Sequence, residues 1–340
     1  MAQHRPSGVT APTMRDVATH AKVSAMTVSR VLKGDPKVAE ATRQRVLGAV
    51  DALGYRRNET ARRLRVGGSG MIGLVVTNLA NPFYSRLALG VQEAAYEHGL
   101  RVLLSNSAEQ VDREKGLVED LAASQVDGMI VVPAGGSHRH LAPAALRGIP
   151  IVLASRPPGG MEADCVLVDD FGGAQAATSR LIEDGHRRIG FLGNPPALYT
   201  GAERFRGYWA AHEEARLEPD ERHVRRGPTD VATAERAALD LLRDPDAPTA
   251  LFCTNNRLTQ GAIRALRTLD VPVSLAGFDD FDLADVLGLP LTIVSYDADE
   301  IGRRAGRMLI DRISAGAGAD LPARRSTVPT EVIRYGTQPS

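Results

Sequence analysis

The sequence is poor in residues on which several classes of protein depend. Two cysteines, Cys165 and Cys253, occur in 340 residues, and aromatic residues make up 4%. Both cysteines lie in apolar, strand-like runs, so we expect buried free thiols in a reducing compartment. No apolar run approaches the roughly 20 residues that a membrane-spanning helix needs, and MAQHRPSGV lacks the apolar segment of a secretory signal. We therefore expect a soluble cytoplasmic protein with no membrane partner.

Charge is balanced over the whole chain but unevenly distributed along it. Residues 1–66 contain 13 Lys/Arg against 5 Asp/Glu, whereas the remainder contains 28 against 36. A basic head on an acidic body favours a polyanion as the partner of the head. A basic surface that is merely solvated is the alternative.

Residues 13–32, TMRDVATHAKVSAMTVSRVL, predict two short helices separated by a sharp turn. Thr13 and Asp16 have the spacing of a capping box, and Ser24 is a second N-cap. This is the spacing of a helix-turn-helix, which places the start of its second helix in the DNA major groove. On spacing alone, an ordinary helical hairpin is an equal alternative.

The same stretch closely resembles the lactose-repressor (LacI/GalR) family. The resemblance continues through VLKGD, TRQRVLGAVDALGYRRN and ARRLR to about residue 66, and covers the rest of the chain more weakly. It implies a one-component transcription factor with a DNA-binding headpiece, a hinge helix and a core like a periplasmic sugar-binding protein.

From residue 71, short apolar runs alternate with amphipathic segments. Continuous apolar strands separated by helices favour parallel sheets that are covered on both faces. The expected strands are 71–76, 101–105, 128–132, 149–154, 165–169, 188–193, 250–254, 274–278 and 292–296, followed by the C-terminal run STVPTEVIRYG. The expected helices include 39–53 (ended by Gly54), 86–98, 112–124, 171–184, 232–242, 260–269 and 300–315.

The expected fold class is α/β, with an all-α helix-turn-helix headpiece and a two-lobed, periplasmic-binding-protein-like core of parallel sheets. The resemblance implies three crossings between the lobes, which we place near 170, 298 and 326. The expected division is a headpiece at 1–57, a hinge helix and linker at 58–70, and an effector-binding and dimerisation core at 71–340. Within that core we expect an N-lobe at about 71–169 and 298–325, and a C-lobe at about 170–297 and 326–340.

The resemblance also implies which residues bind DNA. Ala25, Met26 and Arg30 occupy the base-reading positions, where an Arg can bond a guanine edge and the other two make only apolar contacts. The phosphate-binding or capping positions are Thr13, Ser24, Thr27 and Ser29. In the hinge segment the expected DNA-binding residues are Asn58, Ala61, Arg62 and Leu64, with Leu64 inserted at the central base step of the minor groove.

Four positions depart from the family pattern. Lys22 replaces the usual turn glycine, at a cost of roughly 1 kcal/mol if φ is positive there. Ala39 stands where a capping Ser is common, Arg57 replaces a proline before the hinge, and Asn256 stands where an Asp is usual. We expect the third helix to fray at its start and the hinge to be less rigid.

Ligands of this fold bind beyond the carboxyl ends of the strands. Arg204, in GAERFRG, matches the family's effector-binding arginine. Aromatic side chains can stack on a sugar ring, and charged planar groups bond its hydroxyls. For each candidate, the alternative is a lobe-closing salt bridge or a cap. The candidate effector-binding residues are Phe83, Tyr84, Arg156, Arg204, Asn255 and Asp279.

We expect a sequence-specific transcriptional regulator, in the first instance a repressor. It would bind a pseudo-palindromic double-stranded operator as a homodimer, join the nucleoid when bound, and be controlled by a small ligand, expected to be a sugar. Neither G-x-S-x-G nor HExxH occurs, and His138 and His140 lack a third ligand, so no enzyme, cofactor or metal is expected. One alternative is a carbohydrate sensor or enzyme on the same core; another is a regulator that answers to a nucleobase or a protein.

Overall fold

The computed structural model describes residues 12–32, 35–55, 68–142, 147–316, 319 and 321–336. The chain forms two compact units, Met1–Gly67 and Gly68–Ser340, which are considered separately. The hinge candidates Asn58, Ala61, Arg62 and Leu64, together with Arg57, lie outside the described residues.

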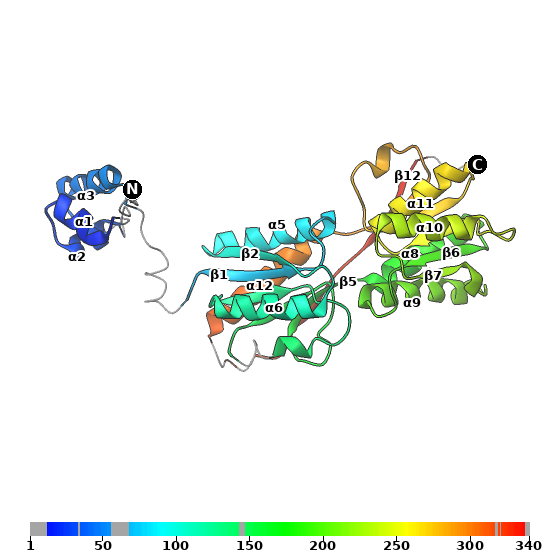
Figure 1. The fold of residues 1–340 in the computed structure, drawn as a ribbon, viewed down its shortest axis with the longest axis horizontal. Helices are drawn as coiled ribbons and strands as arrows, with labels where there is room; N and C mark the ends of the chain where they lie inside the picture. Colours follow the sequence, from blue (N-terminus) through cyan, green and yellow to red (C-terminus); the bar gives the residue numbers. More distant parts are fainter. Residues whose placement is uncertain are drawn as a thin grey trace, which may run out of the picture. The chain divides into compact units, whose positions relative to one another are not determined.

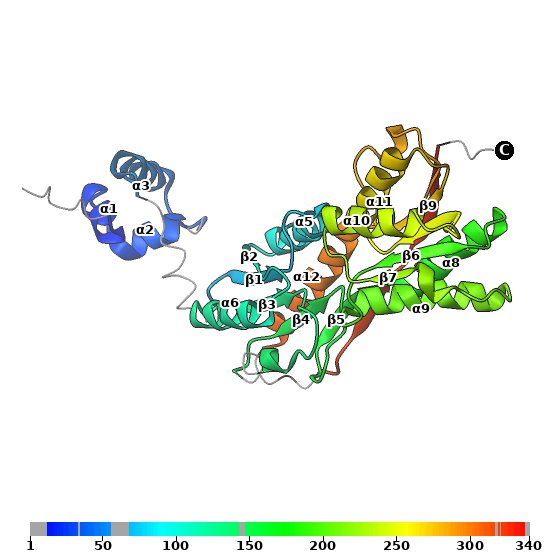
Figure 2. The same ribbon diagram turned by 45° about the vertical axis from the view of Figure 1, so that its right-hand side comes forward.

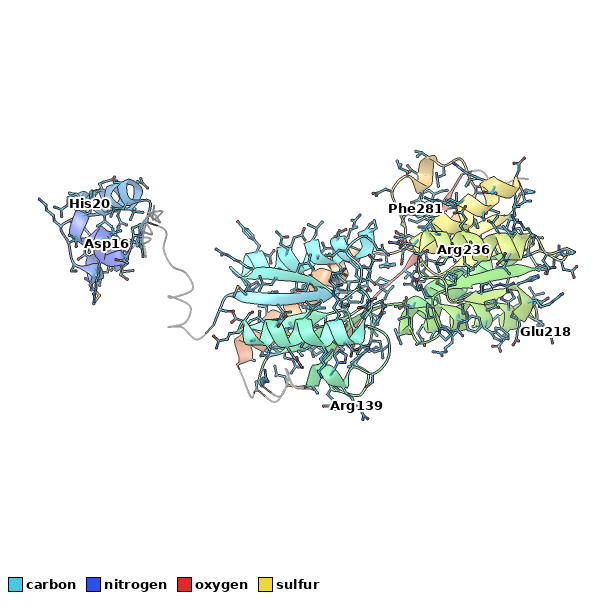
Figure 3. The ribbon with its side chains drawn as sticks, in the orientation of Figure 1. Asp16, His20, Arg139, Glu218, Arg236 and Phe281 are labelled. Carbon is cyan, nitrogen blue, oxygen red and sulfur yellow. The ribbon has the colours of Figure 1, made fainter. Side chains whose placement is uncertain are left out.

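The described residues of the first unit contain three helices, α1 (Met14–His20), α2 (Ala25–Leu32) and α3 (Glu40–Leu53) (Figure 1). The predicted capping box is confirmed, because the Thr13 amide donates to the Asp16 carboxylate at 2.7 Å and the Asp16 amide donates to Thr13 Oγ1 at 3.4 Å (Asp16 is labelled in Figure 3). The second cap is confirmed as well, since the Thr27 amide donates to Ser24 Oγ at 3.1 Å. Two capped helices in this short span form the predicted helix-turn-helix.

Two of the positions that depart from the family pattern lie in the turns around these helices. Lys22 has a φ of 53°, so a side chain stands where the left-handed conformation favours glycine. Ala39 provides no side-chain hydrogen bond to α3, and Gly54 ends that helix at a φ of 59°. The three helices share a small core that includes Val17, Val28, Val31, Val46 and Ala49.

The second unit contains two six-stranded sheets, as predicted for a two-lobed core (Figures 1 and 2). The N-lobe sheet has the order β11-β5-β4-β3-β1-β2, and the C-lobe sheet has the order β12-β10-β9-β8-β6-β7. The N-lobe strands are β1 (Met71–Val76), β2 (Arg101–Asn106), β3 (Gly128–Val131), β4 (Ile151–Ala154), β5 (Asp164–Val168) and β11 (Arg325–Val328). The C-lobe strands are β6 (Ile189–Gly193), β7 (Val224–Arg226), β8 (Ala250–Cys253), β9 (Ser274–Phe278), β10 (Leu291–Ser295) and β12 (Glu331–Tyr335), of which β12 alone pairs antiparallel, with β10.

Helices cover both faces of each sheet. In the N-lobe α5 and α12 pack together against one face and α6 covers the other; in the C-lobe the pairs are α8 with α9 and α10 with α11. Their bounds are α5 (Pro82–Glu97), α6 (Val111–Ala123), α8 (Asp170–Glu183), α9 (Tyr199–Glu214), α10 (Val231–Leu242), α11 (Asn256–Leu269) and α12 (Ala298–Ala315). Short 3₁₀ helices lie at Arg139–Leu141, Glu221–His223 and Ala284–Val286. Neither α9 nor β7 was among the predicted elements; β7 is three residues long and two of them are arginines.

The chain passes between the lobes after β5, after β10 and after β11. The third crossing, which we place near 326, follows Val328, the last residue of β11. The reason is that β11 continues its parallel ladder with β5 as far as the pair Val328–Val168. The residues of the C-terminal run are therefore shared between the two sheets.

Both cysteines are buried free thiols, as predicted. Burial raises the pKa of Cys253 to about 12, so this thiol stays protonated. Within the described part of the chain, no helix is both long and apolar enough to cross a membrane.

A buried carboxylate on β5 holds the last helix and last N-lobe strand in place. Asp164 accepts hydrogen bonds from Arg312 Nη2 at 2.7 Å and from Arg324 Nη2 at 2.8 Å. The Arg324 amide donates to the same carboxylate at 2.8 Å. Burial alone would raise the pKa of Asp164, but the hydrogen bonds from both arginines outweigh it and lower the pKa.

Replacing Asp164→Asn should lower the free energy of unfolding by about 2–4 kcal/mol at pH 7, because two arginines lose their buried carboxylate. The wild-type pKa is lower in the folded chain, so this contribution is present above about pH 4 and is lost as the pH falls further. Urea unfolding from pH 3 to pH 7 measures it. Asp311→Asn removes an exposed partner of Arg324 and is the matched control; equal losses in both variants would contradict the assignment.

Candidate functional site

The start of α2 presents side chains that the headpiece core does not use. Met26 is 69% exposed, whereas Val28 and Val31 on the opposite face are buried. Ala25 is exposed and Ser29 is half-buried. A large apolar side chain that remains in water at the first turn of a helix is available to a partner.

The polar residues of the same helix divide into two groups. Ser24, Thr27 and Thr13 already make helix caps, with Ser24 Oγ and Thr27 Oγ1 2.9 Å apart. Arg30 is exposed and lies 3.8 Å from Asp35, a loose pair of the kind that contributes little to stability. Its guanidinium can therefore exchange this partner for another.

In the core, backbone strain gathers at the carboxyl ends of strands. Ala108 and Glu109 follow β2, Ser155 follows β4 and Asp279 follows β9, and each has a φ between 54° and 67°. These four are among nine described residues other than glycine with positive φ, and the remaining five lie in turns and at helix ends. Strain of this kind persists where the surrounding structure imposes it, which is common at ligand sites.

The N-lobe has a buried arginine at this edge. Arg156 donates from Nη2 to Glu109 Oε2 at 3.0 Å, and from Nη1 to the other Glu109 oxygen and to the Pro133 carbonyl. The Gly135 amide also donates to Glu109, at 3.1 Å. Both terminal nitrogens of the predicted effector residue Arg156 are thus engaged within its own lobe, whereas its Nε has no hydrogen-bond partner among the described residues.

The two histidines of the H-x-H motif shape the loop after β3. His140 Nε2 lies 2.6 Å from Glu114 Oε1, and the Ala134 amide donates to the other Glu114 oxygen at 2.6 Å. His138 accepts from the Gly159 amide at Nδ1 and lies 3.2 Å from the Ala134 carbonyl at Nε2. Burial raises the pKa of Glu114, and the hydrogen bonds from Ala134 and His140 oppose that rise. The two rings bond to separate partners and do not converge on one point.

The C-lobe has a second buried arginine, placed by the contact between α8 and α9. Gly207 permits that contact, because a Cβ there would lie 2.2 Å from the Phe171 carbonyl oxygen. One turn earlier, Arg204 donates from Nε to Asp170 Oδ1 at 2.7 Å and from Nη1 to the Thr254 carbonyl. Its guanidinium also stacks 3.6 Å above the centre of the Phe278 ring.

A second carboxylate and a tyrosine complete this cluster. Asp279 Oδ1 lies 3.5 Å from Arg204 Nη1 and accepts from the Tyr296 hydroxyl at 2.6 Å. Phe83, at the start of α5, meets the Tyr296 ring edge-on at 6.0 Å between centroids, and Tyr84 at 4.8 Å. The structure therefore brings together four of the six predicted effector residues, with Tyr84 joined to the cluster through the Phe83 ring.

The remaining candidate, Asn255, is committed to the structure of the C-lobe. Its Oδ1 accepts from the Leu258 amide and caps α11, and its Nδ2 donates to Asn194 at 2.9 Å. Among the described residues, the hydrogen bonds and ion pairs of Arg204 go to oxygens of Asp170, Thr254 and Asp279, and not to Asn256. Asp170 and Tyr296 were not among the predicted site residues, although Asp170 directly follows the predicted strand 165–169 and Tyr296 ends the predicted strand 292–296.

Asp170 has an unusual electrostatic position. It is buried, and its Oδ2 has no hydrogen-bond partner among the described residues. Burial raises the pKa of this carboxyl to about 6, and Arg204 only partly opposes the rise. One arginine between two buried carboxylates cannot fully compensate both.

Comparison with known proteins agrees with this arrangement. Residues 13–58 match the family described as bacterial regulatory proteins, lacI family. Residues 69–334 match the periplasmic binding proteins and sugar binding domain of LacI family.

Individual relatives cover nearly the whole chain. The HTH-type transcriptional repressor CytR of Escherichia coli (strain K12) is 32% identical over 319 residues, which are 92% of this chain and 94% of the relative. A solved complex of the transcriptional regulator CelR with cellobiose is 32% identical, covers 96% of this chain and all of that one, and has a TM-score of 0.71. The Lac repressor bound to ONPG superposes with a TM-score of 0.85 over 96% of this chain and all of that one; at 23% identity it supports the fold alone.

Asp170→Asn should change the pH dependence of stability. A pKa of about 6 in the folded chain, against about 3.9 in the unfolded chain, makes the wild type lose stability as the pH rises from 4 to 6. The variant lacks this loss, so relative to the wild type it should gain about 2–3 kcal/mol across that window. Urea unfolding at pH 4, 5, 6 and 7 measures the difference.

Asp169→Asn is the matched control, because Asp169 caps α8 at Gly172 and an Asn preserves such a cap. It should follow the wild type at every pH. A constant stability difference between Asp170→Asn and the wild type would show that Asp170 does not titrate in this window.

Proposed function

The chain belongs to the LacI family of bacterial regulatory proteins, and from this premise we propose that it is a repressor that binds a pseudo-palindromic operator under the control of a small ligand. The observation that carries the DNA-binding part is Met26, a large apolar side chain left 69% exposed at the first turn of the second helix of the helix-turn-helix. The excess of Lys and Arg in residues 1–66 supplies the sequence-independent attraction to phosphates.

In this proposal the first turns of α2 enter the major groove. Ala25 and Met26 make apolar contacts with bases, and Arg30 exchanges its loose pair with Asp35 for a guanine edge. The caps at Thr13, Ser24 and Thr27, together with Ser29, lie against phosphates. The hinge residues Asn58, Ala61, Arg62 and Leu64 would bind the minor groove, with Leu64 inserted between bases.

The proposed effector site is the edge at which Phe83 and Tyr84 of the N-lobe face Arg204 and Asp279 of the C-lobe. A flat apolar ring face above polar groups suits a sugar, whose ring has an apolar face and hydroxyls at its rim. Asn255 and Arg156 are retained as supports rather than direct contacts, because caps and ion pairs already occupy them. Sugars are the first class to test, and cellobiose, bound in the solved CelR complex, is the first compound.

A homodimer is the proposed assembly. Apolar side chains gather on α5 and on β2, the strand at the edge of the N-lobe sheet: Leu89, Tyr96, Leu103 and Leu104 are 37–82% exposed. An apolar edge strand left open favours pairing with another copy of the chain. A dimer would place two copies of α2 on the two halves of a pseudo-palindrome.

The proposed domains are a headpiece at 1–57, a hinge at 58–70 and a core from 71 onward. The last crossing between the lobes of the core follows Val328. The protein would act in the cytoplasm and lie on the nucleoid while its operator is occupied.

Arg30→Ala should weaken operator binding by roughly 1–3 kcal/mol and relax the preference at one position of each half-site. Arg45→Ala removes the same charge from an exposed position on α3 and should weaken specific and random DNA alike. Fluorescence anisotropy with operator and scrambled duplexes at fixed salt measures both. If Arg30→Ala lowers the two affinities equally, Arg30 contacts only phosphate.

Arg204→Lys should weaken binding of the effector by about 2 kcal/mol, since an ammonium keeps the charge but loses the planar fork. The compound is chosen by a thermal-shift screen of cellobiose, other sugars and nucleosides, and its affinity is measured by calorimetry. Arg206→Lys, on the same helix at an exposed position where the arginine pairs with Glu203 and lies over the Phe171 ring, should bind like the wild type. Equal affinities in the two variants would remove Arg204 from the site.

A further inference from the structure

A hydrogen bond between two buried amides joins the lobes. Asn81 stands immediately before α5 in the N-lobe, and Asn256 is the first residue of α11 in the C-lobe. Asn256 Nδ2 donates to Asn81 Oδ1 at 3.0 Å, across 175 residues of sequence. Both side chains are buried, at 8% and 1% exposure.

The direction of this bond is fixed by the helix that Asn81 caps. Asn81 Oδ1 also accepts from the Phe83 amide at 3.1 Å, so the oxygen, not the nitrogen, must face the C-lobe. Position 256 must therefore supply a donor. An Asp there would set a buried, acceptor-only carboxylate against an acceptor oxygen. The Asn at 256, where the family pattern has Asp, is what makes the bond possible in this chain.

The C-lobe itself does little to fix the side chain of Asn256. Its Oδ1 is buried without a partner among the described residues, so the bond to Asn81 is the hydrogen bond that its side chain makes. Burying the side-chain carbonyl of Asn256 without a hydrogen bond costs desolvation free energy, which offsets part of the free energy gained from the bond to Asn81. The net stabilisation from this contact is therefore small. A contact of small net stability is one that a ligand can break or reinforce.

The bond lies between the two halves of the proposed effector site. Asn81 is two residues from Phe83, and Asn256 is two residues from Thr254, whose carbonyl oxygen accepts from Arg204. The neighbouring contact between the lobes, Phe83 against Tyr296, is an edge-on aromatic pair without a fixed hydrogen-bond direction. Of these two contacts, the amide pair is the one with a fixed hydrogen-bond direction; Tyr199 of α9 and Arg325 of β11 form a further hydrogen bond between the lobes.

We propose that Asn256 is a positioning residue that holds the lobes in this arrangement when no effector is bound. This rests on the proposed control by a ligand between the lobes, because it names the contact against which that ligand works. The bond sets the ratio of the arrangement described here to a more open one, and the effector changes that ratio through Phe83 and Arg204.

The same substitution, Asn to Asp, is made at three positions. The comparison separates the loss of the hydrogen bond from the effect of an added charge. Asn256→Asp removes the donor and adds repulsion. Asn81→Asp leaves an acceptor for both the Asn256 amide and the Phe83 amide, so it keeps the bond. Asn255→Asp adds the same charge one residue away, keeps the cap on α11 and loses only a hydrogen bond to Asn194 within the C-lobe, so it is the matched control. Asn256→Ala removes the donor without adding charge.

The readout is the distance between the lobes in the full-length protein, without DNA or effector. Labels are placed on cysteines introduced at the exposed positions Glu119 and Arg243; native Cys165 and Cys253 are buried and do not compete. Labelled chains are diluted into unlabelled ones, and the distance distribution is measured by pulsed electron paramagnetic resonance. Circular dichroism checks that each variant folds.

Asn256→Asp should move the distribution to longer distances, with a change of roughly tenfold in the ratio of the two arrangements, and Asn256→Ala should move it less in the same direction. Asn81→Asp and Asn255→Asp should match the wild type. A wild-type distribution in folded Asn256→Asp and Asn256→Ala would overturn the proposal, and so would Asn81→Asp behaving like Asn256→Asp. If Asn256→Asp does not fold, Asn256→Ala decides. A failure of operator or sugar binding leaves this measurement unaffected, so the two proposals fail separately.

Discussion

Each of the two buried arginines at the carboxyl ends of the strands needs a carboxylate, and this requirement shapes both lobes. Arg156, which follows β4, binds Glu109 and the loop after β3. Arg204 of α9 binds Asp170 at the start of α8 and Asp279 at the end of β9. The backbone accepts strain to meet the requirement, since Glu109 and Asp279 both adopt positive φ. The polar edge of each sheet is thus built before any ligand arrives, which keeps the cost of ordering a ligand site low.

The elements that local patterns encode could be predicted from the sequence. Thr13 and Ser24 carry their caps within three residues, and the apolar runs of both sheets are continuous, so the headpiece and the paired sheets followed from them. The end of β11 did not follow from such patterns, because it depends on the pairing of that strand with β5, far away in the sequence. Three-residue β7 owes its conformation to β6 rather than to its own residues.

The residues of the candidate site were likewise predictable from the sequence only in part. Arg204 and Asp279 were identifiable from the motifs around them, whereas the partner Asp170 was not, since nothing in its neighbours indicates that Gly207 lets α9 approach α8. Asn255 was expected to face a ligand, and nothing in FCTNN distinguishes a helix cap from a ligand contact. The departures from the family pattern were informative in both units: Lys22 does adopt positive φ, and Asn256 makes a bond that an Asp would not.

The shared C-terminal run has a consequence for how the protein is made. On the ribosome, β5 emerges long before its neighbour β11, and its open edge carries buried residues such as Val166 and Leu167. At synthesis rates of roughly 5–20 residues per second, that edge waits on the order of ten seconds or more for its partner. Neither lobe is therefore complete until the C-terminal run has emerged, since β11 completes the N-lobe sheet and β12 then completes the C-lobe sheet. During that interval the nascent chain is a natural client for chaperones, and a message truncated before codon 325 would leave both lobes without a strand.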